Sequence, residues 1–184
     1  MVVMAVLLIL VAFVLVWFLY TYNSFIALKV RVDNAWSQID VQLKRRHDLI
    51  PNLVEMVKGY MAYEKDTLER VIKARTQAVQ ATGIKDKAEA ENFLTQTLRS
   101  LFAVVERYPD LKANQNVLKL QEELTSTENK ISFARQYYND EVSRYNTQVQ
   151  IAPVNMVAGM FGFSKKDFFQ IEDETEKKPP EVKF

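Results

Sequence analysis

The first twenty residues carry no charged side chain, and this feature constrains the fold more than any other. The run reads MVVMAVLLILVAFVLVWFLY and is apolar around its whole circumference. About 20 residues at a rise of ~1.5 Å per residue are enough to cross a hydrocarbon core of roughly 30 Å. A helix that is apolar on all faces suits lipid better than the core of a small soluble domain. The sequence therefore predicts a transmembrane anchor over residues 1–22.

The flanks of this run favour a retained, single-pass anchor over a cleaved signal peptide. No basic region precedes the run, and no small-x-small cleavage site follows it. Trp17, Tyr20 and Tyr22 lie at its C-terminal end, where amphipathic rings favour a membrane interface. Lys29 and Arg31 are the first basic side chains, and both follow the run. By the positive-inside rule, the soluble part is predicted to lie in the cytoplasm.

The composition narrows the class of the remaining chain. At 184 residues there is room for one domain besides the anchor. The formal net charge of +1 gives no global bias toward nucleic acid or acidic partners. The lack of cysteine excludes disulfides, thiolate metal sites and a cysteine nucleophile. With four glycines and five prolines, the chain has few breakers, which favours a mostly helical protein.

Beyond the anchor, apolar residues recur at helical spacing. The stripe consists of Phe25, Leu28, Val32, Trp36, Ile39, Leu43, Ile50, Val54, Val57, Met61, Leu68, Ile72 and Val79. It is interrupted by Arg46 and His47, and its phase does not change at Pro51. Two interpretations stay open: a single helix kinked at Pro51, or two helices, the second with Asp48 as its N-cap.

Two breakers divide the rest of the chain. ATGIKD at 81–86 separates the stripe from a helix predicted over residues 87–107, and YPDLKAN at 108–114 ends that helix. Pro109 would clash with a continuing helix, and it pushes Tyr108 toward extended geometry. The apolar face of the predicted helix consists of Leu94, Leu98, Leu101 and Val105.

The last long helix repeats apolar residues every seven positions. Its seam consists of Val117, Leu124, Ile131, Tyr138 and Tyr145. Sustained seven-residue spacing is typical of helices that pack at shallow angles in a bundle. We therefore expect an all-α protein, an antiparallel four-helix bundle of long helices over residues 23–152, behind the N-terminal transmembrane helix.

The character of the chain changes at Pro153. Residues 153–171 hold apolar side chains and two glycines without a clear period. We expect this segment to pack on the end of the bundle, with the bilayer surface as the alternative. In either case its buried face would consist of Met156, Met160, Phe161 and Phe163. The tail, residues 172–184, is charged, contains proline and is predicted to be disordered.

Three long segments, in this order, resemble the LemA family. They are VDNAWSQIDVQLKRRHDLIPNLVEMVKGY, LFAVVERYPDLKAN and ENKISFARQYYNDEVSRYN, and FGF follows them. The resemblance covers nearly the whole chain, and it implies an antiparallel helical bundle anchored at the bacterial inner or plasma membrane. It implies no catalytic residues. One departure is IAP at 151–153, where family members often carry a bulkier aromatic residue before the proline.

The stretch RRHD at 45–48 is the most polar interruption of the apolar pattern. Arg45, Arg46, His47 and Asp48 could bind an anionic group near a helix start, or His47 could donate a proton. The favoured interpretation is a salt-bridged bend with Asp48 as a cap, because a general base needs a nucleophile or metal partner nearby.

Glu128 interrupts the seam of the last helix, as Arg46 and His47 interrupt the first stripe. We hypothesise that an interior ion pair or polar layer joins them, a feature that more often sets register than adds stability. The predicted polar bend or interaction site thus comprises Arg45, Arg46, His47, Asp48, Pro51 and Glu128.

Other site chemistries lack the residues that they need. Di-metal bundles use Glu-x-x-His pairs, and no glutamate stands three positions before His47, the single histidine. Tyr137, Tyr138 and Tyr145, with Phe133, could form a stacking platform for nucleic acid, but such a platform needs interleaved basic residues on an open groove. The seven-residue spacing of Tyr138 and Tyr145 instead places these two in the seam. The sequence contains no Gly-rich phosphate loop or GxSxG turn. It therefore predicts no catalytic residue, metal, cofactor or nucleic-acid partner.

These features favour a membrane-anchored scaffold or adaptor without catalytic activity. Residues 1–22 would contact the lipid bilayer, and the long helical faces would bind membrane proteins or copies of the same chain. One alternative is a lipid-binding or membrane-remodelling bundle that acts through residues 154–169. The other is a membrane-bound hydrolase or transferase that uses His47 with Asp48 or Glu55.

Overall fold

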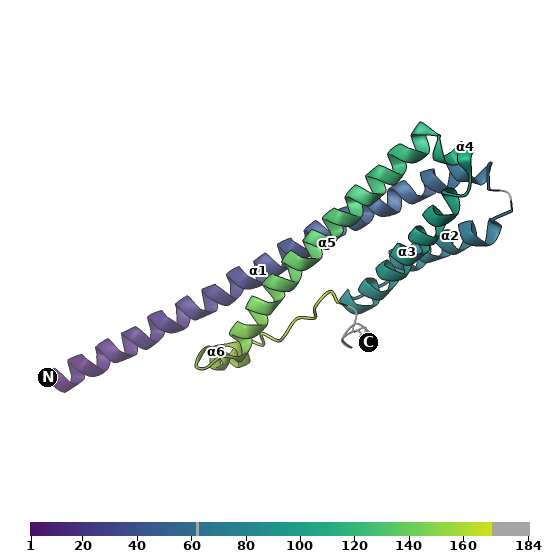
Figure 1. Ribbon diagram of the computed structural model, residues 1–184. Coiled ribbons are helices and arrows are strands. Elements are labelled where there is room, and N and C mark those ends of the chain that lie inside the picture. Colours follow the sequence, from purple (N-terminus) through teal and green to yellow (C-terminus); the bar gives the residue numbers. More distant parts are fainter. Residues whose placement is uncertain (62, 171–184) are drawn as a thin grey trace, which may run out of the picture. The chain divides into compact units, whose positions relative to one another are not determined.

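The computed structural model describes residues 1–61 and 63–170, and every regular element within those ranges is a helix (Figure 1). The helices are α1 (Val2–Lys58), α2 (Lys65–Gln80), α3 (Ile84–Val105), α4 (Pro109–Lys112), α5 (Gln115–Gln150) and α6 (Val154–Met160). The prediction of an all-α protein is confirmed. The tail at 172–184, predicted to be disordered, lies outside the described residues.

The chain divides into two compact units. The first comprises Met1–Lys44 and Glu128–Asp167, and the second comprises Arg45–Thr127 together with 168–170 of the described residues. α1 and α5 each contribute to both units, so each unit is built from parts of the sequence that lie far apart.

A single helix runs through Pro51, since α1 is continuous from Val2 to Lys58. Asp48 therefore lies inside a helix and is exposed, rather than acting as an N-cap. An interior proline costs about 3 kcal/mol of helix stability. Ile50, Leu53 and Val57 are fully buried on the same stretch, and each contributes about 1.5–3 kcal/mol. Burial on both sides of the proline thus outweighs its cost.

A turn that the apolar stripe does not predict separates α1 from α2. The backbone amides of Tyr60 and Met61 both donate to the carbonyl of Val57, each at 3.0 Å, and Met61 is fully buried. The stripe continued through this turn to Ile72 and Val79, and both side chains are exposed. The buried face of α2 instead consists of Leu68, Val71, Ala74 and Ala78. Because the helix restarts after the turn, the phase of α1 does not fix the face of α2.

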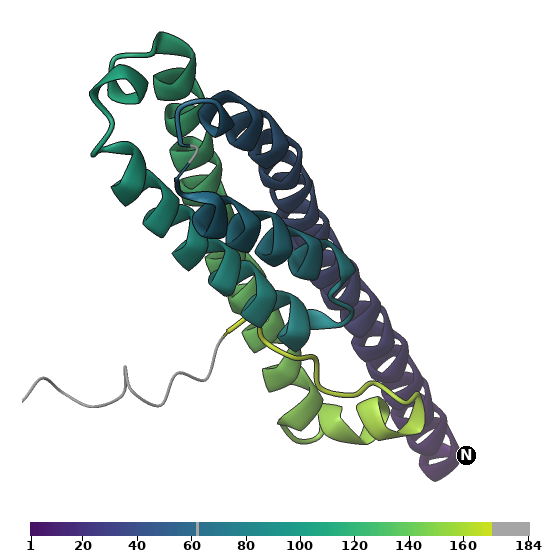
Figure 2. The same cartoon turned by 90° about the vertical axis from the view of Figure 1, so that its right-hand side faces the viewer.

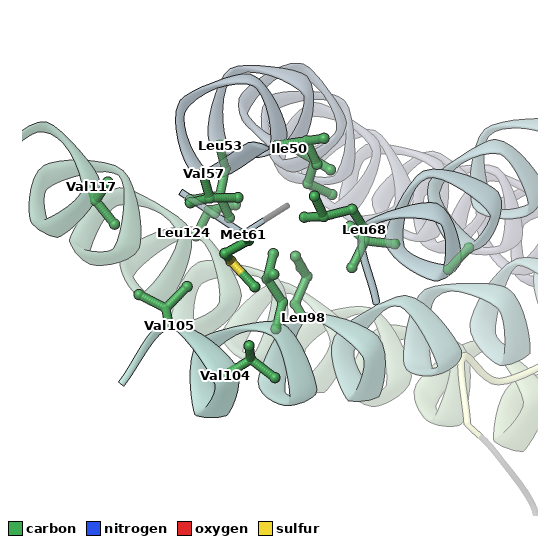
Figure 3. Close-up of a cluster of buried hydrophobic side chains, with 14 of the residues drawn as sticks. Ile50, Leu53, Val57, Met61, Leu68, Leu98, Val104, Val105, Val117 and Leu124 are labelled. Carbon is green, nitrogen blue, oxygen red and sulfur yellow. The ribbon is translucent and has the colours of Figure 1, made fainter. Parts of the chain in front are cut away.

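The second unit is a small helical bundle with its own core. α2 packs against α3, and the short link between them includes Gly83 at a φ of 85°, a conformation that favours glycine. Tyr108 is extended before Pro109, as predicted, and α4 then buries Leu111. Figure 3 shows side chains from α1, α2, α3 and α5 converging on this core. The core includes Ile50, Leu53, Val57, Met61, Leu68, Leu98, Val104, Val105, Val117 and Leu124.

The first unit is an antiparallel pair of helices closed by a returning segment. Phe25 lies beside Tyr145, with ring centroids 6.4 Å apart, and Trp36 lies beside Tyr138, at 5.5 Å. The order of these contacts shows that α1 and α5 run in opposite directions. Figure 2 shows α6 and the chain that follows it beside the N-terminal part of α1. The predicted seam is confirmed within each unit, because its five residues are all buried.

Candidate functional site

A buried ion cluster in the second unit joins α1 to α3. The guanidinium of Arg46 pairs with the carboxylate of Glu91, and His47 Nε2 lies 2.8 Å from Glu91 Oε1. The exposed fractions are 1% for Arg46, 8% for His47 and 2% for Glu91, so the charges are withdrawn from solvent. Buried charges of this kind are tolerated only when they are paired and hydrogen-bonded.

Further hydrogen bonds complete the surroundings of these three side chains. Arg46 donates from Nη1 to Thr95 Oγ1 at 2.8 Å and from Nη2 to the carbonyl of Glu91 at 3.2 Å. Thr95 Oγ1 donates to that same carbonyl at 3.0 Å. Arg75 of α2 donates from Nε to the carbonyl of His47 at 2.8 Å. The cluster therefore fastens α1, α2 and α3 to one another.

The pKa of Glu91 lies below its ordinary value. Burial alone would raise this pKa, but the hydrogen bond with His47 and the charges of Arg46 and His47 lower it further than burial raises it. The carboxylate is thus held in its ionised form between two basic groups. The hydroxyl of Thr95, one turn further along α3, is already hydrogen-bonded to Arg46 and to the backbone. The geometry is that of a structural ion cluster.

The four residues of the RRHD stretch separate onto two faces of α1. Arg46 and His47 point into the second unit, whereas Arg45 and Asp48 are exposed. Arg45 lies 3.8 Å from Glu123 in an ion pair at the surface. The helix periodicity explains this separation, because Arg45 and Asp48 are three positions apart and share one side of the helix, whereas Arg46 and His47 between them fall on the other side.

Glu91 is the acidic partner of Arg46 and His47, and the sequence analysis did not single it out. It stands three positions before Leu94 and seven before Leu98, so the apolar face of α3 already places it inward. Glu128 belongs to the first unit, and its pairing with Arg46 and His47 stays a prediction. Among the described residues, no three His, Asp or Glu side chains lie close enough to hold a metal ion.

An apolar groove of about 560 Å³ lies between α1 and α5 in the first unit. Val41 and Phe133 stand at its surface with exposed fractions of 63% and 72%, and Tyr137 is also exposed. The full lining consists of Ser37, Gln38, Val41, Gln42, Lys130, Phe133, Ala134 and Tyr137. Of the four aromatic residues considered for a stacking platform, Tyr138 and Tyr145 are buried in the seam, as predicted.

The segment after α6 returns along α1 and is fixed there by polar contacts. Asn146 donates from Nδ2 to the carbonyl of Lys166 at 2.9 Å and accepts from its amide at 2.8 Å. Lys166 Nζ lies 2.6 Å from Asp33, and the Tyr138 hydroxyl donates to the carbonyl of Asp167 at 2.9 Å. Burial, together with the charges of Asp167 and Asp33, raises the pKa of Tyr138 to about 12.

The four apolar residues predicted to form one buried face lie in different surroundings. Phe163 is half-buried and stacks on Phe25 of α1, with centroids 4.8 Å apart. Phe161 contacts α1 but stays exposed, and Met156 and Met160 are exposed by 69% and 72%. The buried face of α6 is formed instead by Val157 and Ala158.

Among the described helices, α1 alone is long and apolar enough to cross a membrane, judged by its length and composition. None of its most apolar stretch of 18 residues is buried within the structure, which distinguishes it from a core helix. This finding supports the transmembrane helix that the sequence predicts.

Comparison with known proteins gives a family match and several distant relatives. The model of the LemA family matches residues 35–184. Magnetosome proteins MamQ 2 and MamQ 1 of Paramagnetospirillum magneticum (strain AMB-1) are each 26% identical over 178 residues, covering 83% of this chain and 65% of their own length. Protein LemA of Metamycoplasma hominis is 24% identical over 143 residues, covering 77% of this chain and 65% of its own length. The chain thus spans less than two thirds of the curated relatives that it matches.

Proposed function

Since the chain belongs to the LemA family, we propose that it is a membrane-anchored helical scaffold that binds a helix of a partner protein at a bacterial membrane. The groove between α1 and α5 carries this proposal, because it leaves a large apolar surface open in the unit that also holds the candidate anchor. Contiguous exposed apolar surface on a folded protein commonly marks an interaction site.

The lining of the groove favours an amphipathic helix as the occupant. Val41, Phe133 and Tyr137 offer apolar contacts, and Lys130 and Gln38 supply polar groups around them. An amphipathic helix binds such a groove by placing residues at i, i+3, i+4 and i+7 against it. The side chain of Lys130 would favour a partner helix with an acidic residue beside its apolar face.

The anchor would restrict the search for a partner to the membrane surface. Tethering raises the effective concentration of one protein near another, so a modest affinity is enough for binding. We propose that the soluble part lies in the cytoplasm, because the basic residues Lys29 and Arg31 follow the apolar run on that side. The partner is then a membrane protein or a membrane-associated protein with a cytoplasmic helix.

We propose no catalytic role for the polar cluster. His47 is buried and faces Glu91, whereas Asp48 and Glu55, its partners in the hydrolase alternative, are both exposed on α1. A catalytic base must reach the proton that it removes from a substrate. The cluster serves better as a fastening between helices.

A photo-crosslinking amino acid placed at Phe133 tests the scaffold proposal in living cells. The matched control is Phe93 of α3, an exposed phenylalanine outside the groove. We expect a discrete adduct with another protein from position 133 and none from position 93. An adduct formed only with a second copy of the chain would contradict the heterologous partner. Equal labelling from both positions, or none from either, would contradict the groove as a binding site.

A further inference from the structure

We infer that the outer face of α6 is a second membrane contact, seated in the interfacial layer of the bilayer beside the point where α1 leaves it. The contact surface consists of Met156, Met160 and Phe161. This inference goes beyond the proposed function, because it requires the anchor but not a partner protein in the groove.

The end of α6 lies beside the C-terminal end of the apolar run of α1. The ring of Phe161 lies 5.6 Å from that of Phe18 and 4.7 Å from that of Tyr22. Phe18 belongs to the charge-free run, and Tyr22 follows its end. If residues 1–22 cross the bilayer, these two rings lie at its boundary, where aromatic side chains are favoured. These two contacts place the end of α6 at the same depth as Phe18 and Tyr22, and Figure 2 shows α6 beside the N-terminal part of α1.

The segment that contains α6 is uncharged and has an apolar face. No charged side chain occurs from Ile151 to Phe163. Met156 and Met160 are one helical turn apart and therefore project from one face of α6, opposite the buried Val157 and Ala158. An apolar face on a short helix at the membrane boundary is suited to the layer between headgroups and acyl chains.

A backbone hydrogen bond and a ring contact hold the end of α6 in place. The amide of Phe163 donates to the carbonyl of Ala158 at 2.9 Å, and Gly162 has a φ of 70°. This pair of features is the Schellman arrangement that ends a helix, and it requires a residue that tolerates the left-handed region. The stack of Phe163 on Phe25 then fastens the end of α6 to α1. These contacts thus fix the orientation of α6 and keep its apolar face exposed.

The bilayer is favoured over a protein as the occupant because the surface is continuous with the anchor. Phe161 contacts Phe18 of the anchor through its ring and is itself exposed, so an apolar side chain joins the surface of residues 1–22 to that of α6. Lipid that surrounds the anchor would therefore reach α6 without any further association.

Depth-dependent quenching on the full-length protein tests this inference. The chain has no cysteine, so a single cysteine introduced at Met160 can be labelled with an environment-sensitive fluorophore. The labelled protein is reconstituted into phosphatidylcholine and phosphatidylglycerol vesicles that contain lipids spin-labelled near the headgroup. Matched labels at Val16, within the apolar run, and at Phe133, in the groove, give the membrane and solvent references.

We expect M160C to be quenched by the spin-labelled lipid at least several-fold more than F133C, with a blue-shifted emission. A second label at Met156 should behave as the one at Met160 does, which guards against a local defect from one substitution. If the probe at Met160 is quenched no more than the one at Phe133 and has the same solvent-exposed emission, the inference is overturned. A blue-shifted but unquenched probe would indicate a protein occupant and would overturn it as well. An unquenched V16C would show that residues 1–22 do not lie in the bilayer, and this result would also overturn the inference.

Discussion

Arg75 donates a hydrogen bond from Nε to the backbone carbonyl of His47, at 2.8 Å. Pro51 stands four positions after His47 and has no amide hydrogen, so this carbonyl lacks its ordinary helical donor. A side chain of α2 therefore supplies the hydrogen bond that the proline removes from α1. The same contact links the backbone of α1 to the cluster formed by Arg46, His47 and Glu91.

The coupling between Arg75 and Pro51 can be measured with a double-mutant cycle. Arg75→Ala leaves a carbonyl without its donor, which costs about 1–3 kcal/mol. In a Pro51→Ala background the helix supplies its own donor, so the same change should cost clearly less. The free energy of unfolding of the four proteins, measured in detergent by circular dichroism, gives the coupling energy. Equal costs in both backgrounds would show that Arg75 does not compensate for the proline.

Removing the charge of Glu91 should destabilise the second unit strongly. Glu91→Gln leaves the buried guanidinium of Arg46 without a counter-charge, which typically costs about 3–5 kcal/mol. For a chain of this size, that loss corresponds to a fall in the thermal midpoint of roughly 10 °C or more. Thermal unfolding followed by circular dichroism is the measurement.

Glu123→Gln is the matched control for this substitution. It removes an equivalent charge from the exposed pair with Arg45, which is worth about 0–1 kcal/mol because solvent screens it. If the two variants melt together, the burial of the cluster contributes nothing to stability.

The ionisation of Glu91 predicts how stability depends on acidity. Its pKa in the folded protein lies below the ordinary value of 4.5, so the folded state binds this proton less readily than the unfolded state. The contribution is therefore complete above about pH 4.5 and is lost as the pH falls through the folded value. Unfolding midpoints of the wild type and Glu91→Gln between about pH 6 and about pH 3 should converge as the pH falls. Parallel profiles would contradict this assignment.

Asn146→Ala should release the segment that follows α6. The side chain makes two hydrogen bonds to the backbone of Lys166, and its loss leaves a half-buried amide and carbonyl without that partner. We expect faster hydrogen exchange at Lys166 and faster tryptic cleavage beside it. Asp33→Asn, which removes only the ion pair with the Lys166 side chain, should have a much smaller effect. Unchanged exchange in Asn146→Ala would mean that the ring contacts of Phe163 are sufficient.

Periodicity predicted which faces of α1, α3 and α5 are buried, but it could not identify their partners. The seam from Val117 to Tyr145 is buried as its spacing predicts, because a regular helix fixes which side chains share a face. The pairing of His47 with Glu91 joins residues far apart in the sequence, and no local pattern specifies it. Glu91 stands three positions before Leu94 and so lies on the apolar face of α3. A search for charged residues on apolar faces would have found it.

The turn after Lys58 shows a second limit of prediction from hydrophobic periodicity. The stripe kept its helical phase from Met61 to Leu68 across the polar pair Glu64 and Lys65, so periodicity alone did not reveal that the helix stops and restarts. The buried face of α2 was consequently assigned to the large residues Ile72 and Val79, although two of its four buried positions are occupied by alanine. Alanine carries little weight in a hydrophobic pattern, and it marks a close contact only once the neighbouring helix is known.

The small side chains of Ala74 and Ala78 have a consequence for how the second unit tolerates change. Both are fully buried in its core, and almost every substitution at these positions adds volume. An enlarged side chain there would force neighbouring helices apart, which typically costs 1–3 kcal/mol. These two sites should therefore accept only glycine or serine in a functional library, while Leu68 beside them accepts a range of aliphatic replacements.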